Sequence, residues 1–260
     1  MISSQYLIQT RELTKEFNEH KKDNGNLFQL FKKNRMLALD NINIQIQRSE
    51  LICLLGLNGA GKTTLLKILA GILLPTKGEI YIDNIRLDCW RLLKEKVSFC
   101  NGDERGFYWR LTPKDNLKFF GALYGIASKN LEIRMEELFY WFGIDNPCKR
   151  FYEYSSGFKQ RFCIIKALLH NPDILLLDEP WKNLDYITIK FLSNFIKEKL
   201  VCDQKRTVII SMSDLKNIEI FEKLIVLDKG SIMAQGNMEE VKNILRVSNF
   251  EEIFRQDVYE

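Results

Sequence analysis

The sequence predicts an α/β fold, in which a mostly parallel sheet carries an inserted helical lobe. Apolar runs that suit buried strands recur along the chain, for example LICLL, DILLLD and TVIIS, and segments with helical periodicity separate them. Such alternation of strands and helices favours a parallel sheet. The stretch from about 104 to 168 is mostly helical, so we expect it to form the lobe, and we expect a helical tail over about 237–260.

Composition limits the classes of protein that this chain can represent. Its 260 residues suffice for a single domain over 1–260, and 38 basic against 34 acidic residues leave a net charge of only +4. Nucleic-acid-binding proteins usually carry a concentrated basic excess, so no nucleic-acid partner is expected. No apolar stretch approaches the ~18 residues that span a bilayer, and the N-terminus has no signal-peptide pattern. Any role at a membrane would therefore depend on a partner.

The first part of the chain has two strand-like segments, QYLIQTREL and LALDNINIQIQ, on either side of a lysine-rich stretch from Asn18 to Arg35. Within that stretch, NLFQLFKK has the pattern of a short amphipathic helix. We expect one of two roles for it. It faces a membrane or a partner, or it is a surface insertion that folds its Leu and Phe side chains onto its own domain.

A glycine-rich turn joins the strand LICLLG to the helical segment KTTLLKILAG and fits G-x-x-x-x-G-K-[ST] at every fixed position. Glycines in this pattern let backbone N–H groups curl around phosphate oxygens. Lys62 can reach the β- and γ-phosphates, and the hydroxyl of Thr63 can ligate Mg²⁺. The residues expected to bind a nucleotide here are Gly56, Leu57, Asn58, Gly59, Ala60, Gly61, Lys62, Thr63 and Thr64.

The apolar strand ILLLDE ends in two acids, Asp178 and Glu179. Charge is tolerated on a buried strand only where the strand emerges, so Asp178 is expected at the carboxyl edge of the sheet, beside the phosphate loop. Asp178 would hold Mg²⁺ through its water shell, and Glu179 could polarise an attacking water. The alternative is that the two acids only cap a following helix.

A third motif, YSSGFKQR, comes just before an amphipathic helix. Ser155, Ser156 and Gly157 at a helix start combine hydroxyl groups with free backbone N–H groups, which suits an anion. Taken alone, the motif equally suits an ordinary helix cap.

The order of these motifs resembles the nucleotide-binding subunit of ABC transporters. GLNGAGKTT resembles its Walker A motif, YSSGFKQR its LSGGQ-type signature, ILLLDEP its Walker B motif and KNLD its D-loop. The resemblance extends over nearly the whole chain. It implies a RecA-like phosphate-loop fold with an N-terminal antiparallel β subdomain, and an ATPase that uses ATP and Mg²⁺.

The resemblance further implies a head-to-tail homodimer or heterodimer that closes two ATP molecules between its subunits. Ser155 and Gly157 of one subunit would cap the γ-phosphate held by the other, and Asp185 would be the D-loop acid that couples the two sites. Phe17 matches the position that stacks on adenine, although it equally suits the core. A transmembrane permease subunit would hold the protein at the cytoplasmic face of the membrane.

The stretch FYWRLT resembles a branch of the family associated with ABC-2-type exporters of drugs, polysaccharides or lipids. Its aromatic residues, Phe107, Tyr108 and Trp109, would either receive a helix of the transmembrane partner or pack within the lobe.

Three positions depart from the family pattern. The glutamine that ligates Mg²⁺ after the strand KVSFC is missing, and Asn101, Asp103 or Glu104 would take its role. Trp181 replaces a small residue beside the D-loop, where it would either reshape the dimer interface or pack locally. Ser213 stands where the family has a catalytic histidine.

Ser213 bears directly on the rate of hydrolysis. A hydroxyl is shorter than an imidazole and cannot carry a positive charge. The loss of one preorganised donor typically costs about 3–4 kcal/mol, or roughly a hundred- to a thousand-fold in rate. Slow hydrolysis is therefore expected if Ser213 acts in place of the histidine.

Three functions remain open from the sequence. The first is an ATP-hydrolysing subunit that powers an exporter, with Lys62 and Glu179 as catalytic residues. The second is a catalytically impaired ATP-binding subunit of a heterodimeric transporter. The third is a soluble ABC protein without a transport role, which is disfavoured because the chain has a single cassette and no long coiled-coil insertion.

Overall fold

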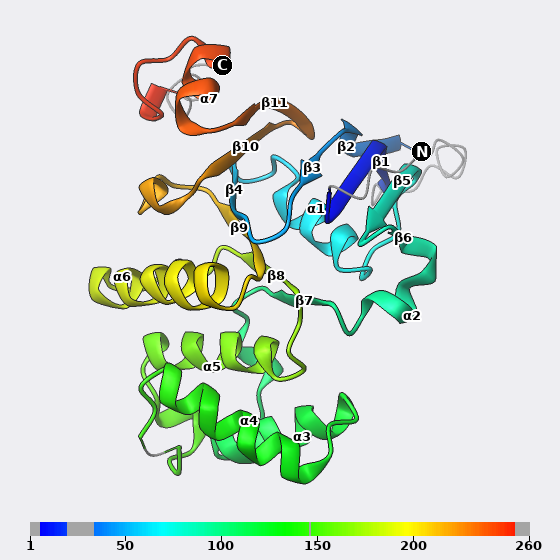
Figure 1. The fold of residues 1–260 in the computed structure, drawn as a ribbon. Coiled ribbons are helices and arrows are strands. Elements are labelled where there is room, and N and C mark those ends of the chain that lie inside the picture. The colour runs from blue at the N-terminus through cyan, green and yellow to red at the C-terminus, as the bar shows by residue number, and fades with distance from the viewer. Residues whose placement is uncertain (1–5, 20–33, 146, 253–260) are drawn as a thin grey trace, which may run out of the picture.

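In a computed structural model of the chain, the described residues are 6–19, 34–145 and 147–252 (Figure 1). The segment NLFQLFKK, expected to form a short amphipathic helix, lies outside them. In the view of Figure 1, a central sheet has the antiparallel N-terminal strands beside it and a group of helices below it. Within the described ranges, no helix is both long and apolar enough to cross a membrane.

The central sheet has six strands in the order β11-β10-β4-β9-β8-β7. All neighbouring pairs are parallel except β10 and β11, so the predicted mostly parallel sheet is confirmed. The strands, in chain order, are β4 (Leu51–Leu55), β7 (Val97–Cys100), β8 (Ile174–Asp178), β9 (Thr207–Met212), β10 (Lys223–Asp228) and β11 (Ser231–Gly236).

A second, antiparallel sheet has the order β2-β1-β5-β6, and β3 also pairs with β1. This confirms the antiparallel subdomain. Its strands are β1 (Ile8–Glu19), β2 (Asn34–Ile42), β3 (Gln45–Ile46), β5 (Lys77–Ile82) and β6 (Ile85–Arg86).

Three helices form the lobe between β7 and β8: α3 (Pro113–Leu123), α4 (Ser128–Trp141) and α5 (Ser156–Leu168). α3 begins where the sequence predicts, because the side chain of Thr112 accepts a hydrogen bond from the backbone N–H of Asp115 and Pro113 occupies the first turn. The remaining helices are α1 (Lys62–Leu69), α2 (Trp90–Leu93), α6 (Tyr186–Asn194), which continues as a π-helix over Phe195–Asp203, and α7 (Met238–Leu245). The single-domain organisation stays a prediction.

The central sheet separates two hydrophobic cores. Along β4, Leu51, Cys53 and Leu55 belong to one core, whereas Ile52 and Leu54 belong to the other. This assignment follows from the alternation of side chains between the two faces of a strand. Because both faces are covered, β4 has an uninterrupted apolar sequence, as expected for a buried parallel strand.

The sequence left open whether Trp181 packs locally or at a dimer interface, and whether the aromatic residues of FYWRLT pack within the lobe or receive a partner. Trp181 is only 3% exposed and packs in the core that includes the lobe, so it packs locally. Phe107 is also buried, with its ring stacked on that of Phe151 at 4.3 Å between centroids. Tyr108 and Trp109, in contrast, are 51% and 46% exposed. Of the three aromatic side chains of FYWRLT, Tyr108 and Trp109 are therefore accessible to a partner and Phe107 is not.

Candidate functional site

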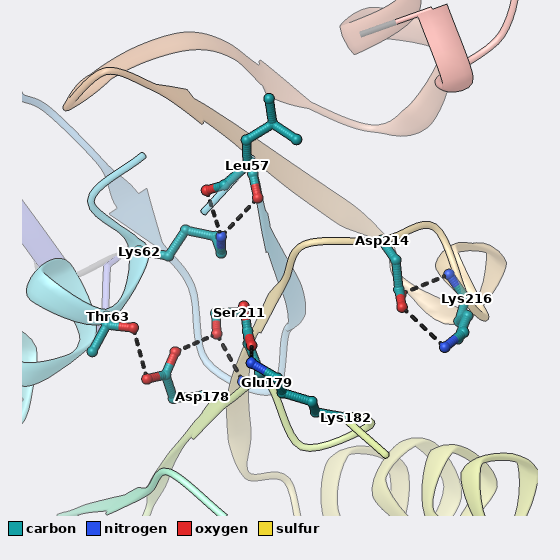
Figure 2. Close-up of polar contacts among 10 residues, drawn as sticks. Leu57, Lys62, Thr63, Asp178, Glu179, Lys182, Ser211, Asp214 and Lys216 are labelled. Atoms are coloured by element: carbon teal, nitrogen blue, oxygen red, sulfur yellow. Dashed lines mark hydrogen bonds and ion pairs between the residues drawn. The ribbon is translucent and has the colours of Figure 1, made fainter. Parts of the chain in front are cut away.

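The glycine-rich turn between β4 and α1 curls around the ammonium group of Lys62. Nζ of Lys62 donates hydrogen bonds to the carbonyl oxygens of Gly56 and Leu57, at 2.7 and 2.9 Å (Figure 2). Gly61 has φ +102°, and an added Cβ there would lie 2.7 Å from the carbonyl oxygen of Ala38. Only glycine fits this left-handed position, which allows the helix to start with its N–H groups facing the turn.

Asp178, at the end of β8, connects the phosphate loop with the next strand. Its Oδ2 accepts a hydrogen bond from the Thr63 hydroxyl at 2.8 Å, and its Oδ1 accepts one from the Ser211 hydroxyl at 2.6 Å (Figure 2). The same Ser211 hydroxyl oxygen accepts a bond from the backbone N–H of Glu179 at 2.9 Å. Neighbouring parallel strands β8 and β9 therefore place Asp178 beside the phosphate loop, as predicted, with Glu179 next to it.

This arrangement fits a Mg²⁺ ion. Thr63 and Asp178 present a hydroxyl and a carboxylate oxygen 2.8 Å apart. Oxygen ligands of this kind suit Mg²⁺, which usually keeps several waters and takes its remaining ligands from phosphate groups. A complete protein cage is thus not needed for the metal to bind here.

Glu179 stands at the turn that follows β8 with φ +47°, a backbone conformation that is rare for residues other than glycine. Burial raises the pKa of its carboxyl group, but hydrogen bonds from Lys182 and Ser213, together with the charges of Lys182 and Lys62, outweigh burial and lower it. Lys182 Nζ lies 3.1 Å from Oε2 of Glu179. Glu179 is therefore a carboxylate at neutral pH, which is the form that accepts a proton.

The lowered pKa gives a testable pH dependence. In Lys182→Gln, we expect the acid limb of the ATPase pH profile to move to higher pH, because the pKa of Glu179 rises when its strongest cationic partner is removed. The profile of kcat between pH 4 and 8 measures this shift. Lys190→Gln removes an exposed lysine of α6 as the matched control, and an equal shift in both variants would contradict the assignment.

A cleft of about 460 Å³ opens beside these groups. Thr63, Asp178 and Glu179 line it. The other lining residues come from the phosphate loop, the segment after β7, the start of α5 and the segment before α6: Asn58, Asn101, Gly102, Glu104, Ser156, Gln160, Lys182, Asn183 and Leu184. Four motifs that are far apart in the sequence thus share one concave surface.

The lining of the cleft distinguishes between the three residues that were candidates for the role of the missing glutamine. Asn101 and Glu104 line it, whereas the carboxylate of Asp103 accepts bonds from the backbone and side chain of Arg105, both at 2.9 Å. Gln160 also lines the cleft, is 7% exposed, and its Nε2 has no hydrogen-bond partner among the described residues. Of the three candidates, Asn101 and Glu104 line the cleft and Asp103 does not, although the carboxylate of Glu104 also lies 3.2 Å from Lys159 Nζ.

The signature turn begins α5 as predicted, because the Ser155 side chain accepts a hydrogen bond from the backbone N–H of Phe158. An added Cβ at Gly157 would lie 3.0 Å from the hydroxyl oxygen of Thr188. That hydroxyl donates to Asp185, 2.8 Å away, and Asp185 caps α6. The signature and the D-loop therefore pack directly against each other. Ser155 and Gly157 do not line the 460 Å³ cleft of their own chain.

Two other residues predicted for the site, Phe17 and Ser213, have fewer contacts that bear on their roles. Phe17 belongs to neither hydrophobic core; it is half-buried on β1, and Lys15 Nζ lies 5.0 Å from its ring centre. This excludes the alternative of a core phenylalanine. Ser213 follows β9 and contacts Glu179 through its hydroxyl, so the end of TVIISM does form an edge of the site.

The sequence reasoning missed three residues of the site: Ser211, Lys182 and Gln160. Ser211 is fully buried at the end of an apolar strand, and a polar residue in such a position signals a specific partner. Lys182 lies three residues after Glu179, a spacing that allows an ion pair. No sequence signal distinguishes Gln160 from other polar residues of its helix.

The fold and the cleft together define a phosphate-loop nucleotide-binding protein. A family model described as ABC transporter matches residues 39–182, which is more than half of the chain. The chain belongs to the ABC transporter family.

Named relatives and solved structures agree with this assignment. The chain is 31% identical to the ABC transporter ATP-binding protein NatA of Bacillus subtilis (strain 168), over 86% of this chain and 91% of that protein. It is 30% identical to the bacitracin transport ATP-binding protein BcrA of Bacillus licheniformis, over 91% of this chain and 71% of that protein. The fold matches that of the dimeric ATP-binding cassette MJ0796 bound to ADP and Pi, with a TM-score of 0.75 and 23% identity over 89% of this chain and 98% of that one.

Proposed function

We propose that this protein is the ATP-binding and ATP-hydrolysing subunit of a membrane exporter. The observation that carries the proposal is the hydrogen-bonded set in which Asp178 joins Thr63 of the phosphate loop to Ser211, and Ser211 in turn holds the backbone of Glu179. This set keeps a metal ligand, a phosphate-binding loop and a proton acceptor in one place. Those are the parts that phosphoryl transfer to water requires.

Each group has a separate task in the proposed reaction. The ammonium group of Lys62 would exchange its two neutral carbonyl acceptors for charged phosphate oxygens, which form stronger bonds. Thr63 and Asp178 would hold Mg²⁺, which neutralises charge on the phosphates. The Glu179 carboxylate would accept the proton of the attacking water.

We also propose that ATP closes a head-to-tail dimer. The support is that Ser155 and Gly157 do not line the cleft of their own chain and that they lie at a helix start, which suits an anion; Ser155 is exposed, whereas Gly157 is buried. They would cap the γ-phosphate bound by a second subunit, and hydrolysis would reopen the dimer. The contact between Gly157 and Thr188 would link this movement to Asp185 of the D-loop.

Dimer closure can be tested by light scattering in a Glu179→Gln background, which retains ATP. With ATP and Mg²⁺ we expect the mass to double, and we expect Ser155→Arg to remain a monomer because its long side chain blocks the second phosphate contact. Ser128→Arg, which alters an exposed serine at the start of α4, is the control and should still dimerise. ATP-dependent dimers of Ser155→Arg would reject the proposed role of the signature.

A transmembrane permease is the proposed second partner, and it would hold the protein at the cytoplasmic face of the membrane. Support comes from relatives whose names include bacitracin transport and a probable multidrug ABC transporter, YbhF of Escherichia coli. Further support comes from the exposed side chains of Tyr108 and Trp109 on the lobe. Trp109 stays accessible although Lys159 Nζ lies 5.1 Å from its ring centre.

A second candidate function is an ATP-binding subunit that hydrolyses slowly beside a more active partner in a heterodimer. Ser213 favours it, since a hydroxyl that contacts Glu179 cannot replace a cationic donor to the γ-phosphate. The turnover of the purified chain, measured alone and with Ser213 replaced, distinguishes the two candidates.

A further inference from the structure

A second cleft, of about 580 Å³, lies at the opposite edge of the central sheet from the phosphate loop. Arg206 immediately precedes β9, whereas Ser211 near the other end of β9 bonds to Asp178. At about 3.3 Å per residue of strand, the two sites are about 16 Å apart. The lining residues are Asn130, Ile133, Arg134, Glu137, Asn171, Gln204 and Arg206.

Arg206 is a buried cation without an acidic partner. It is 6% exposed, and among the described residues no carboxylate lies within 4.0 Å of its guanidinium group. Its donors instead meet neutral acceptors: Pro172 O, Asn171 Oδ1 and Gln204 Oε1. Burial, followed by the charge of Arg134, lowers its pKa to about 10, so the group is still charged at neutral pH. Buried charges are normally paired, and this one forms no ion pair with any residue that the structure describes.

A second arginine adds to the positive charge of this cleft. Arg134, on α4, donates to Glu137 at 2.5 Å and to the carbonyl oxygen of Leu168 at 3.1 Å. Its buried Nε has no hydrogen-bond partner among the described residues. Glu137 thus pairs with Arg134, and Asp173, the other acid near Arg206, lies 4.0 Å from Lys96. Both acids therefore have another cation nearby, and neither forms an ion pair with Arg206, although their charges still act on it.

The amide groups beside Arg206 can act as further donors. Because Oδ1 of Asn171 and Oε1 of Gln204 accept from Arg206, their NH₂ groups are left to donate. The cleft is therefore rich in donors, and its lining has two arginines against one acid, Glu137. Several N–H donors arranged around a concave surface suit a tetrahedral oxyanion, and guanidinium groups bind such oxygens in pairs.

We propose that this cleft binds a small doubly charged oxyanion, such as sulfate or the phosphate group of a small metabolite, between α4 of the lobe and the start of β9. The donors come from both parts of the protein: Asn130 and Arg134 from the lobe, Asn171, Gln204 and Arg206 from the sheet core. The anion bridges the lobe and the core. It supplies the negative charge that Arg206 lacks.

Equilibrium dialysis with radiolabelled inorganic sulfate, at constant ionic strength and with saturating Mg²⁺ and ADP, tests the proposal. The nucleotide occupies the phosphate loop, and a Lys62→Ala arm removes sulfate binding there independently of it. We expect one saturable sulfate per chain in both arms. No saturable uptake, or uptake that disappears only with Lys62→Ala, overturns the second site.

Variants at the rim of the cleft separate binding from folding. Ile133 is 60% exposed, so Ile133→Glu adds a carboxylate to the cleft without disturbing a core. We expect this variant and Arg206→Gln to lose saturable sulfate binding, while the neutral Ile133→Gln retains it. Circular dichroism checks that each variant is folded. Equal sulfate binding by Ile133→Glu and Ile133→Gln overturns the proposal even if Arg206→Gln does not fold.

Discussion

Glu179→Gln is expected to lower ATP turnover by about a hundred- to ten-thousand-fold, the usual contribution of a positioned general base. The amide keeps the size of the side chain, and the hydrogen bond from the backbone N–H of residue 179 to Ser211 is unaffected. It cannot accept a proton, however. ATP binding should persist, because Lys62, Thr63 and Asp178 are unchanged. Phosphate release measures turnover, and a fluorescent ATP analogue measures binding.

The matched control is Glu104→Gln, which alters the other glutamate of the same cleft. Its carboxylate pairs with Lys159 at 3.2 Å, and a glutamine at this position keeps an oxygen that can ligate Mg²⁺, so this change should lower turnover far less than Glu179→Gln does. If wild type and Glu179→Gln are equally inactive while both bind ATP, the chain is not an ATPase. If Glu104→Gln instead causes the larger loss, the general base has been assigned to the wrong acid.

Ser213→His is expected to raise ATP turnover, by up to about a hundred-fold, because it restores a long donor to the charge that develops on the γ-phosphate. Ser213 is half-buried at the end of β9, which leaves room for a larger side chain. Its present hydroxyl contributes to the lowered pKa of Glu179 but is too short to extend far beyond it. The change in kcat at saturating ATP measures the gain.

Ser213→Gln is the control for length without positive charge. A similar gain with glutamine would show that reach, and not charge, limits the wild-type protein. In the double variant Ser213→His, Glu179→Gln, the gain should disappear, since histidine only assists the water that Glu179 activates. If Ser213→His leaves a slow but active protein unchanged, Ser213 does not limit its rate.

Much of the fold could be predicted because local patterns and packing point to the same structure. The apolar run of β4 requires a strand covered on both faces, and two cores do cover it. The cap formed by Thr112 and the glycine-rich turn before Lys62 depend on neighbours in the sequence, so both were predictable. The position of Asp178 beside Thr63 was also predictable, because the carboxyl ends of parallel strands lie at one edge of the sheet.

The surroundings of other residues depend on partners that the sequence does not bring together. Ser211 lies 33 residues from Asp178 along the chain, and only the pairing of β8 with β9 makes them neighbours. Trp181 and Trp109 look alike in the sequence, yet one is 3% and the other 46% exposed. Side-chain burial depends on which elements pack over a residue, and local pattern does not specify that.

By itself, the sequence determined the α/β class, the phosphate loop and the positions of the two acids, because each is encoded within a short stretch. Only the tertiary structure decided that Lys182 and Ser213 together lower the pKa of Glu179, and that Arg206 is buried near Arg134 with no ion pair to any described residue. The physical reason is that electrostatic effects depend on distance and burial. Folding sets both by joining segments that the chain keeps far apart.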